Sequence, residues 1–349
     1  MTVPPAEVLA RYAGFESAAA RPYGRGLIND TFLLEGPAGR CVLQRLHPVF
    51  GAAVHHDIEA VTAHLARNGM VTPRLIPTRD GALWVERPTP ERTEVWRAQT
   101  FLPDLRTYDR LARDDHAAAA GALVGRFHRA LRGLEHEYRF VRAGVHDTQG
   151  HLATLAAAVE ASSGHRLYEE VAPLAEAILA AGRALPDLTG LPRRHSHGDL
   201  KLSNLLFDER REGVCLVDLD TVGRMNLAFE LGDALRSWCN PSGEDATDCA
   251  ISAERVGLAV AGYASAARDL VDPAEAESLV DGLATICVEL AARFAADALL
   301  ERYFGWDPSR HPSRGAHNLV RARGQWSLAR SVLADRAGLD ARVAAAMAA

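Results

Sequence analysis

The segment His197-Gly198-Asp199-Leu200-Lys201-Leu202-Ser203-Asn204 is the densest polar motif of the chain. An apolar run at 205–207 follows it directly, and a second apolar run at 214–217 leads into Asp218-Leu219-Asp220. The turn residues Glu212-Gly213 between the two runs predict a β-hairpin. Such a hairpin would place both polar loops near one end of a small sheet.

The polar groups of these loops suit phosphoryl transfer. That reaction needs a carboxylate that orients the acceptor hydroxyl and takes its proton, oxygen ligands for Mg²⁺ beside the phosphates, and a cation on the transferred group. Mg²⁺ prefers one or two carboxylates together with phosphate oxygens and water. Asn204 and Asp218 fit this demand. For Asp220 the sequence leaves metal ligation and a supporting or capping role equally open.

Lys201 is the only lysine in the chain, because every other residue in the combined lysine and arginine count of 39 is arginine. A codon bias towards arginine explains why lysine is scarce. It does not explain why the single lysine lies inside the densest polar motif.

The pattern H-G-D-L-K-L-S-N followed by L-V-D-L-D resembles the catalytic and metal loops of the kinase superfamily. Its HGD form is similar to the aminoglycoside phosphotransferase and choline kinase branch. The resemblance implies that Asp199 is the catalytic base, that Asn204 and Asp218 bind the metal, and that His197 supports the loop. It also implies that Lys201 contacts the γ-phosphate and that the cofactors are ATP and Mg²⁺.

Over most of residues 20–330 the chain is similar to bacterial N-acetylhexosamine 1-kinases. The segments that carry this similarity are 26–32, 42–45, 218–222, 230–236, 289–294 and 318–323. The similarity implies transfer of phosphate from ATP, with Mg²⁺, to the anomeric hydroxyl of N-acetylglucosamine or N-acetylgalactosamine.

A glycine-containing turn, Gly24-Arg25-Gly26-Leu27-Ile28-Asn29, lies where these kinases cover the nucleotide. Glycines let backbone N–H groups approach phosphates closely. We therefore expect Gly24, Gly26 and Asn29 to contribute to nucleotide binding. Taken alone the signal is weak, because any hairpin turn can carry two glycines.

The chain departs from the kinase pattern on the strand that normally presents a phosphate-binding lysine. That strand reads Val42-Leu43-Gln44-Arg45, so the neutral Gln44 stands in the lysine's place. Strand alternation puts Arg45 on the opposite face. Either Arg45 reaches round through a bulge, or the nucleotide is held without that charge. Glu59 is the acid on the next helix that is best placed to pair with such a cation; a solvated helix residue is the alternative.

The character of the 349-residue chain changes near residue 104. Strands are predicted before it, near 27–34, 41–46, 74–78, 82–87 and 94–101, with helices at 6–13 and 55–68. After it, periodic alanine- and leucine-rich segments predict helices at 114–132, 148–162, 168–184, 244–269, 273–303 and 315–346. This order indicates an α+β protein.

The resemblance implies a bilobal protein-kinase-like fold, with a small β-rich N-lobe and a larger, mainly helical C-lobe. We expect residues 1–104 to form the nucleotide-binding lobe. Residues 105–349 would form the helical lobe, with the catalytic loop, the metal loop and the acceptor site.

Two residues outside the loops are further candidates. Asp233 is expected early in a helix that begins near Phe229, where an acid complements the helix dipole and can cap the helix. We interpret it as structural support for the metal loop. Arg293 lies between apolar residues in Ala291-Ala292-Arg293-Phe294 and is a candidate for binding the substrate; a solvated surface arginine is the alternative.

Bulk properties exclude several classes of partner. The formal net charge is −6 and no run of basic residues is present, whereas nucleic-acid binders carry a clustered basic face. No segment has the pattern of a signal peptide or the length of a membrane span. We therefore expect a cytoplasmic monomer or homodimer that binds a small-molecule substrate, a sugar, and neither nucleic acid nor membrane. The five cysteines lack metal or disulfide spacing and are expected to be buried apolar residues.

Three functions remain open at this stage. The first is an ATP- and Mg²⁺-dependent kinase of a sugar hydroxyl. The second is a kinase of another acceptor, such as an aminoglycoside, choline or an amino alcohol. The third is a pseudokinase that binds a nucleotide without phosphotransfer, for which Gln44 is the only support.

Overall fold

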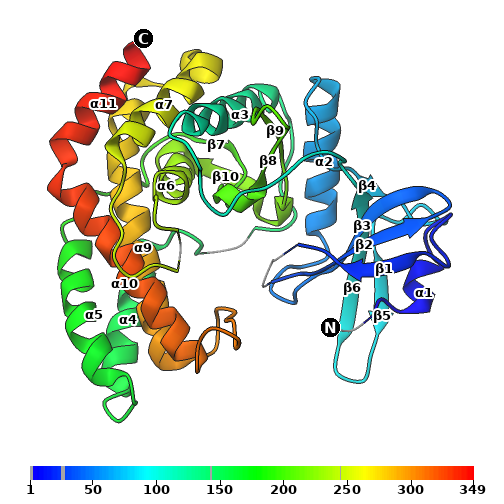
Figure 1. The fold of residues 1–349 in the computed structure, drawn as a ribbon, viewed down its shortest axis with the longest axis horizontal. Coiled ribbons are helices and arrows are strands. Elements are labelled where there is room, and N and C mark those ends of the chain that lie inside the picture. The colour runs from blue at the N-terminus through cyan, green and yellow to red at the C-terminus, as the bar shows by residue number, and fades with distance from the viewer. Residues whose placement is uncertain (1–2, 25–27, 142–143, 244) are drawn as a thin grey trace. The chain divides into compact units, whose positions relative to one another are not determined.

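The computed structural model describes residues 3–24, 28–141, 144–243 and 245–349. The chain divides into two compact units, and Figure 1 labels their elements. The first, called the sheet unit, comprises Met1–Leu105, Ala130–Arg142 and Val217–Val222. The second, called the helical unit, comprises Arg106–Arg129, Ala143–Leu216 and Gly223–Ala349. The α+β composition that the sequence predicts is confirmed.

The sheet unit is built on an antiparallel sheet with the strand order β1-β2-β3-β6-β4, in which β5 also pairs with β6. Its described elements are α1 Ala6–Leu9, β1 Ala19–Pro22, β2 Asp30–Gly36, β3 Gly39–Arg45, α2 Val54–Arg67, β4 Leu75–Ile76, β5 Val85–Pro88 and β6 Thr93–Thr100. The strands expected near 27–34 and 41–46 form a hairpin, since β2 and β3 pair from Asp30↔Arg45 to Gly36↔Gly39. The helix expected at 6–13 ends early, at Leu9, because the chain turns there and buries Tyr12 in the core under the sheet.

A later segment of the chain joins the sheet unit through one buried acid. Asp57 on α2 is fully buried, and its carboxylate accepts the backbone N–H groups of Arg139 at 2.8 Å and Phe140 at 2.9 Å. His136 Nε2 lies 2.8 Å from the same carboxylate. Hydrogen bonds to a buried charge are the strong ones, so Asp57 fixes residues 136–140 against α2.

The helical unit is organised around α9, Leu279–Leu300, which packs against α4, α5, α6 and α10 (Figure 1). Its other helices are α3 His116–Ala130, α4 Thr148–Ala161, α5 Tyr168–Gly182, α6 Leu227–Trp238, α7 Ala253–Ala267, α8 Pro273–Glu277, α10 Arg314–Ala334 and α11 Arg336–Ala348. Two small antiparallel pairs complete it: β7 Arg193–Ser196 with β10 Gly223–Asn226, and β8 Leu205–Phe207 with β9 Gly213–Leu216.

Glycine allows α6 and α9 to approach closely. A Cβ atom added to Gly282 on α9 would lie 2.0 Å from the carbonyl oxygen of Ala228 on α6. One added to Gly232 on α6 would lie 2.6 Å from the backbone of Gly282. Backbone atoms cannot move aside as a flexible side chain can, so this contact requires glycine. It fixes the helix that supports the polar loop described below.

Three predicted helices are shorter or divided. The helix expected at 244–269 begins only at Ala253, because backbone N–H groups before it are taken by serines of α10: Cys249 N donates to Ser327 Oγ at 3.2 Å, for example. The helix expected at 273–303 is broken at Ser278, whose hydroxyl donates back to Glu275 O at 2.7 Å. The helix expected at 315–346 is interrupted at the non-helical Asp335, where φ is −110° and ψ is 28°.

Two predictions from composition can be compared with the structure. All five cysteines are free and buried, as expected for small apolar residues. Among the described residues, no helix has the length and apolar character needed to span a bilayer.

Candidate active site

The motif 197–204 lies in the helical unit between β7 and β8. After β7 the chain turns at Gly198, whose φ of +82° is a conformation that favours glycine. A single 3-10 turn, η1 Leu202–Asn204, then leads directly into β8. The hairpin predicted from the sequence is confirmed, because β8 pairs antiparallel with β9.

The first half of the loop is held by Glu230, in the first turn of α6. One of its oxygens accepts the backbone N–H of His197 at 2.7 Å, and the other accepts that of Gly198 at 3.0 Å. The side chain of Glu230 is 1% exposed, and His128 Nε2 lies 3.3 Å from it. Burial raises the pKa of Glu230, but the hydrogen bond and charge of His128 outweigh it and hold the pKa below its usual range. A buried carboxylate thus clamps the backbone beside Asp199.

The second half of the loop is held by the end of α6. Trp238 Nε1 donates to the carbonyl of Leu200 at 2.8 Å, and the backbone N–H of Leu202 donates to Ser237 Oγ at 2.9 Å. The side chains of Leu200 and Leu202 are buried. Apolar burial and these bonds leave the loop backbone little freedom, so the side chain of Lys201, between the two leucines, extends from a fixed backbone.

Asp199 and Lys201 face each other across this loop. Lys201 Nζ donates to Asp199 Oδ2 at 2.5 Å, and both side chains are 29% exposed. Burial raises the pKa of Asp199, but the charge and hydrogen bond of Lys201 more than compensate, with help from the charges of His197 and Arg236. The pKa of Asp199 therefore lies below its ordinary value, and the group is a carboxylate at neutral pH, as a general base must be.

Asn204 has the arrangement expected of an oxygen ligand. Its Nδ2 donates to the carbonyl of Asp199 at 2.9 Å, which fixes the amide orientation. In the described part of the chain, the side-chain oxygen of Asn204 accepts no hydrogen bond, so it is available to a cation. A hard ion such as Mg²⁺ takes amide and carboxylate oxygens. The role of Asn204 as a metal ligand stays a prediction that this orientation favours.

Asp218 and Asp220 belong to the sheet unit. Asp218 has φ 65° and ψ 58°, a left-handed conformation that is uncommon outside glycine and is often found at functional sites. Asp220 is buried, and both its oxygens are engaged: Arg97 donates to Oδ1 and Oδ2, and Asn29 Nδ2 donates to Oδ2 at 2.7 Å. Of the two roles left open for Asp220, these contacts favour a supporting one, and metal ligation stays a prediction.

The glycine-containing turn is only partly described. Gly24 has φ +80°, which favours glycine. Gly26 lies outside the described residues. Asn29 bridges two parts of the sheet unit, because its Oδ1 accepts the backbone N–H of His47 at 2.9 Å while its Nδ2 binds Asp220. Nucleotide binding by these residues stays a prediction.

The structure settles which charges surround Gln44. Arg45 does not reach round to its face, since Asp30 accepts from its Nε at 2.8 Å and Glu94 from its Nη1 at 2.7 Å. Glu59 does not pair with a cation on β3 either; its partner is Arg74, at 2.6 Å. Each residue has a nearer partner of opposite charge, so of the alternatives left open the structure favours those without these pairings. Nucleotide binding by Gln44, Arg45 and Glu59 stays a prediction.

The expected position of Asp233 at the start of the helix is wrong, while its support of the metal loop stays a prediction. The helix begins at Leu227 with Asn226 as its N-cap, which accepts the N–H of Phe229 at 3.0 Å. Asp233 is therefore past the first turn, where it neither caps the helix nor meets its dipole. Its Oδ1 binds Arg236 Nη2 at 2.8 Å, and its buried Oδ2 has no hydrogen-bond partner among the described residues.

Arg293 lies on α9 with 15% of its side chain exposed. Its guanidinium packs 5.5 Å from the ring of Phe304 and lies 3.8 Å from Glu289 Oε1, too far for a hydrogen bond. Burial lowers the pKa of Arg293, while the charges of Glu289, Asp233 and Asp199 act to raise it. The negative charge of Asp199 therefore acts on the guanidinium of Arg293.

Comparison with known proteins is consistent with this geometry. The sequence model of the phosphotransferase enzyme family, abbreviated APH, matches residues 19–308, which is most of the chain. The chain belongs to the phosphotransferase enzyme family. Membership places it among the small-molecule kinases of that family.

Solved structures share the fold of this phosphotransferase. An aminoglycoside phosphotransferase from Alicyclobacillus acidocaldarius is 16% identical, with a TM-score of 0.62 over 99% of this chain and 98% of that one. A microcompartment-associated aminopropanol kinase is 17% identical, with a TM-score of 0.62 over 95% and 97%. An amicoumacin kinase, solved in complex with AMP-PNP, Ca²⁺ and Ami, is 13% identical, with a TM-score of 0.61 over 91% and 90%. The protein-kinase-like fold expected from the sequence is confirmed.

Sequence reasoning missed three residues that organise the phosphotransferase loops. Glu230 and Trp238 hold the loop 197–204, and Arg97 holds Asp220. Glu230 opens a segment that the resemblance covers, but nothing in the sequence shows that its carboxylate meets the loop. Arg97 has no sequence signal beyond being an arginine between Trp96 and Ala98 in a strand.

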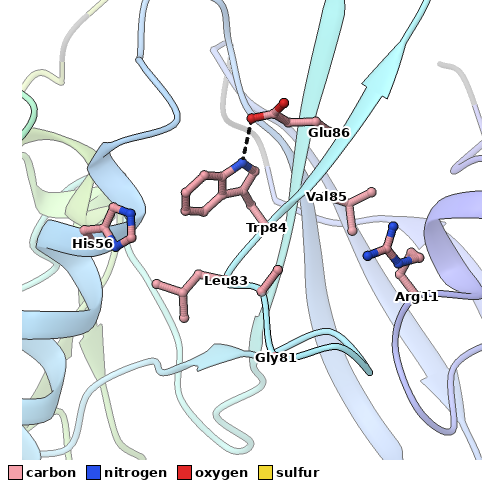
Figure 2. Close-up of a pocket in the computed structure, with 8 residues that line it drawn as sticks. Arg11, His56, Gly81, Leu83, Trp84, Val85 and Glu86 are labelled. Carbon is pink, nitrogen blue, oxygen red and sulfur yellow. Dashed lines mark hydrogen bonds between the residues drawn. The ribbon is translucent and has the colours of Figure 1, made fainter.

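A hollow of about 460 Å³ in the sheet unit lies apart from these residues. Figure 2 shows it lined by Arg11, His56, Trp84 and Glu86, with the indole N–H of Trp84 donating to Glu86 at 3.1 Å. No candidate site residue in the described part of the chain lines it.

The pairing of Lys201 with Asp199 predicts how kcat/KM depends on pH when Lys201 is replaced. Removing the cation in Lys201→Gln leaves burial, which favours the protonated acid, so the pKa of Asp199 should rise. Since the base works as a carboxylate, the acid limb of kcat/KM should then begin at a higher pH than in the wild type. Lys201→Arg, which keeps the charge, should leave the limb near its original place. Profiles of kcat/KM against pH test this, and identical acid limbs in Lys201→Gln and wild type would contradict it.

Proposed function

We propose that this phosphotransferase moves the γ-phosphoryl group of ATP, with Mg²⁺, to a hydroxyl of a sugar, and that the acceptor is the anomeric hydroxyl of an N-acetylhexosamine. Family membership supports phosphotransfer. The amicoumacin kinase of the same fold, solved with a nucleotide analogue and a divalent cation, supports use of both. The sequence similarity to N-acetylhexosamine 1-kinases over residues 20–330 supports the acceptor.

Asp199 is the proposed base. Its carboxylate orients the acceptor hydroxyl and takes its proton as the hydroxyl oxygen bonds to the γ-phosphorus. The bond from that phosphorus to the β,γ-bridging oxygen breaks, and ADP leaves with the electron pair. Lys201 lies beside Asp199 and places its charge where the transferred group gains negative charge.

Asn204 and Asp218 are the residues that would hold Mg²⁺. The available amide oxygen of Asn204 and the left-handed backbone of Asp218 fit this role. A bound Mg²⁺ would neutralise charge on the phosphate oxygens. The residues of this chain would then orient the hydroxyl and receive its proton.

One observation carries the choice of acceptor class. The guanidinium of Arg293 is mostly buried, makes no hydrogen bond in the described part of the chain, and feels the charge of Asp199. Buried donors need acceptors, and hydroxyl and carbonyl oxygens of a sugar supply them. A cationic acceptor would meet a like charge instead. Arg293 therefore favours a neutral, oxygen-rich acceptor.

The second candidate function is phosphorylation of a cationic alcohol. Proteins of the same fold are described as aminopropanol and choline/ethanolamine kinases. Their identities of 16–17% to this chain carry the fold and not the acceptor. The partly exposed Asp233 and the buried Glu289, whose charges act on Arg293, are the residues that such an acceptor would use.

A kinase assay over a panel of acceptors tests the proposal. ATP and Mg²⁺ would be supplied with N-acetylglucosamine, N-acetylgalactosamine, glucose, choline, ethanolamine and an aminoglycoside, and phosphorus NMR would locate the new ester. We expect the two N-acetylhexosamines to be phosphorylated at the anomeric oxygen with the highest kcat/KM. Preference for a cationic alcohol would remove the sugar proposal. Nucleotide binding without turnover of any acceptor would establish the pseudokinase alternative.

Arg293 supplies a matched pair of variants for the same assay. A hydrogen bond to a charged group contributes about 1.5–3 kcal/mol, so Arg293→Met should lower kcat/KM for the sugar roughly 10- to 100-fold. Arg293→Lys should lose less, because it keeps a donor and a charge. If Arg293→Met phosphorylates N-acetylhexosamines as the wild type does, Arg293 does not select the acceptor.

A further inference from the structure

Arg97 forms a buried ion pair that the resemblance did not indicate. It lies on β6, directly opposite Gln44 of β3. Its guanidinium binds both oxygens of Asp220, with Nη2 3.0 Å from Oδ2. The side chains of Arg97 and Asp220 are each 1% exposed. Charges are almost never buried so completely unless they are paired, so the pair fixes where Asp220 lies.

The donors of Arg97 are used within the protein. Its Nε donates to Gln44 Oε1 at 2.9 Å and its Nη2 to the same oxygen at 2.7 Å. Gln44 in turn donates to Thr31 Oγ1 at 3.1 Å. Arg97 is therefore a cation that holds other residues and not one that reaches out to a phosphate. Strands β2, β3 and β6 are connected in this way to Asp220.

This arrangement explains why residue 44 is neutral. Gln44 offers Arg97 a carbonyl oxygen, whereas a lysine at the same position would place a second buried cation against the guanidinium. Like charges at such close range in a poorly solvated site repel strongly. The missing lysine on β3 is therefore matched by an arginine on the neighbouring strand.

The helix beside the sheet supplies no acid to Arg97. Glu59 on α2 binds Arg74, and Asp57 binds the segment 136–140. The α2 residue that feels the charge of Arg97 is His55, which is fully buried and stacks on Trp84. Burial, reinforced by the charge of Arg97, lowers the pKa of His55 to about 4. His55 is thus neutral at pH 7, and Asp220 is the acid that balances Arg97.

We propose that Arg97 is a positioning residue: through Asp220 it fixes the segment Asp218-Leu219-Asp220 in the sheet unit and thereby presents Asp218 for metal binding. The kinase pattern expects an ion pair between a lysine on β3 and an acid on α2; in this chain the buried ion pair of the sheet joins Arg97 on β6 to Asp220. The assignment rests on the proposed function only for the role of Asp218.

A double variant tests this without leaving a charge unpaired. Removing one member of a buried pair is strongly destabilising, whereas replacing both by apolar residues of similar size is often neutral. Arg97→Met combined with Asp220→Leu should therefore unfold near the wild-type temperature. Arg97→Met alone should unfold earlier, which circular dichroism would record.

The decisive measurement is metal binding. Titration of Mn²⁺ into protein saturated with AMP-PNP, followed by electron paramagnetic resonance, reports the metal without requiring turnover. Residues that orient metal ligands typically contribute about 10–100-fold to metal affinity, so the double variant should bind Mn²⁺ weaker by that factor. In the kinase assay its half-saturating Mg²⁺ concentration should rise similarly. A folded double variant with wild-type Mn²⁺ affinity would overturn the proposal.

Two controls separate the possible failures. Arg87→Met removes an ion pair with Glu94 elsewhere on the same sheet and should leave Mn²⁺ affinity unchanged. The exchange Gln44→Lys with Arg97→Gln returns a cation to β3 and should recover part of the lost affinity. If the wild type binds Mn²⁺ with AMP-PNP but phosphorylates no acceptor, the proposed function fails while the positioning role of Arg97 is still decided by the variants.

Discussion

Asp199→Asn should fold like the wild type and lose nearly all turnover. The amide has the same shape as the carboxylate but cannot accept the acceptor's proton, and general base catalysis typically contributes about 10²–10⁴-fold. The loop itself should persist, because Glu230, Ser237 and Trp238 hold its backbone and not its carboxylate. Steady-state kinetics with the preferred sugar would measure the loss in kcat.

A matched control is available for this variant. Asp187 is exposed, and its side chain bonds only to the neighbouring Thr189 among the described residues. Asp187→Asn should therefore keep wild-type kinetics and stability. Near-wild-type activity in Asp199→Asn would remove Asp199 from the mechanism, whatever the stability of the variant.

The loop 197–204 and the hairpin after it were predictable because their sequence signals are local. The polar motif, the two apolar runs and the turn between them occupy consecutive residues, so β8, β9 and the loop before them follow from the order along the chain. The β2–β3 hairpin follows in the same way from a two-residue turn. Local pairing requires no knowledge of how distant segments meet.

The partners of the loops were not predictable because they are distant in sequence. Arg97 meets Gln44 across 53 positions and Asp220 across 123. Glu230 reaches the backbone of His197 from 33 positions away. Residues that the sequence analysis singled out instead also carried a suitable charge. Arg45 was a candidate cation for the nucleotide, and Asp233 was a candidate acid for supporting the metal loop. Only the strand order and the packing of α6 decide between them.

Several predicted helix boundaries were wrong for a related reason. The pattern of alanine and leucine continues through Ser278 and Asp335, so periodicity alone predicts unbroken helices. The breaks come from side chains that bond to nearby backbone or end a turn, as Ser278 does with Glu275. Hydrogen bonds of this kind, from a side chain to nearby backbone, change where a helix ends without changing which face of the helix is apolar.

Glu230→Gln should weaken both stability and turnover. A glutamine has one accepting oxygen, so its amide NH₂ would face the N–H of either His197 or Gly198, two donors that the carboxylate now satisfies. An unsatisfied buried donor costs about 1–3 kcal/mol, which denaturant unfolding at pH 7 would measure. Displacement of the backbone next to Asp199 should also lower kcat, by up to about 10²-fold for a shift of 1 Å.

The same residue predicts how stability depends on pH. Because its pKa is lowered in the folded protein, ionised Glu230 stabilises the fold above the pKa of the unfolded chain, and this contribution is lost as the pH falls through the folded value. The difference in unfolding free energy between wild type and Glu230→Gln should therefore shrink in acid. The exposed Glu209→Gln serves as the control and should track the wild type at every pH. A difference that stays constant from pH 7 down to pH 3 would show that Glu230 is not held as a carboxylate, and its role as the clamp of the catalytic loop would have to be abandoned.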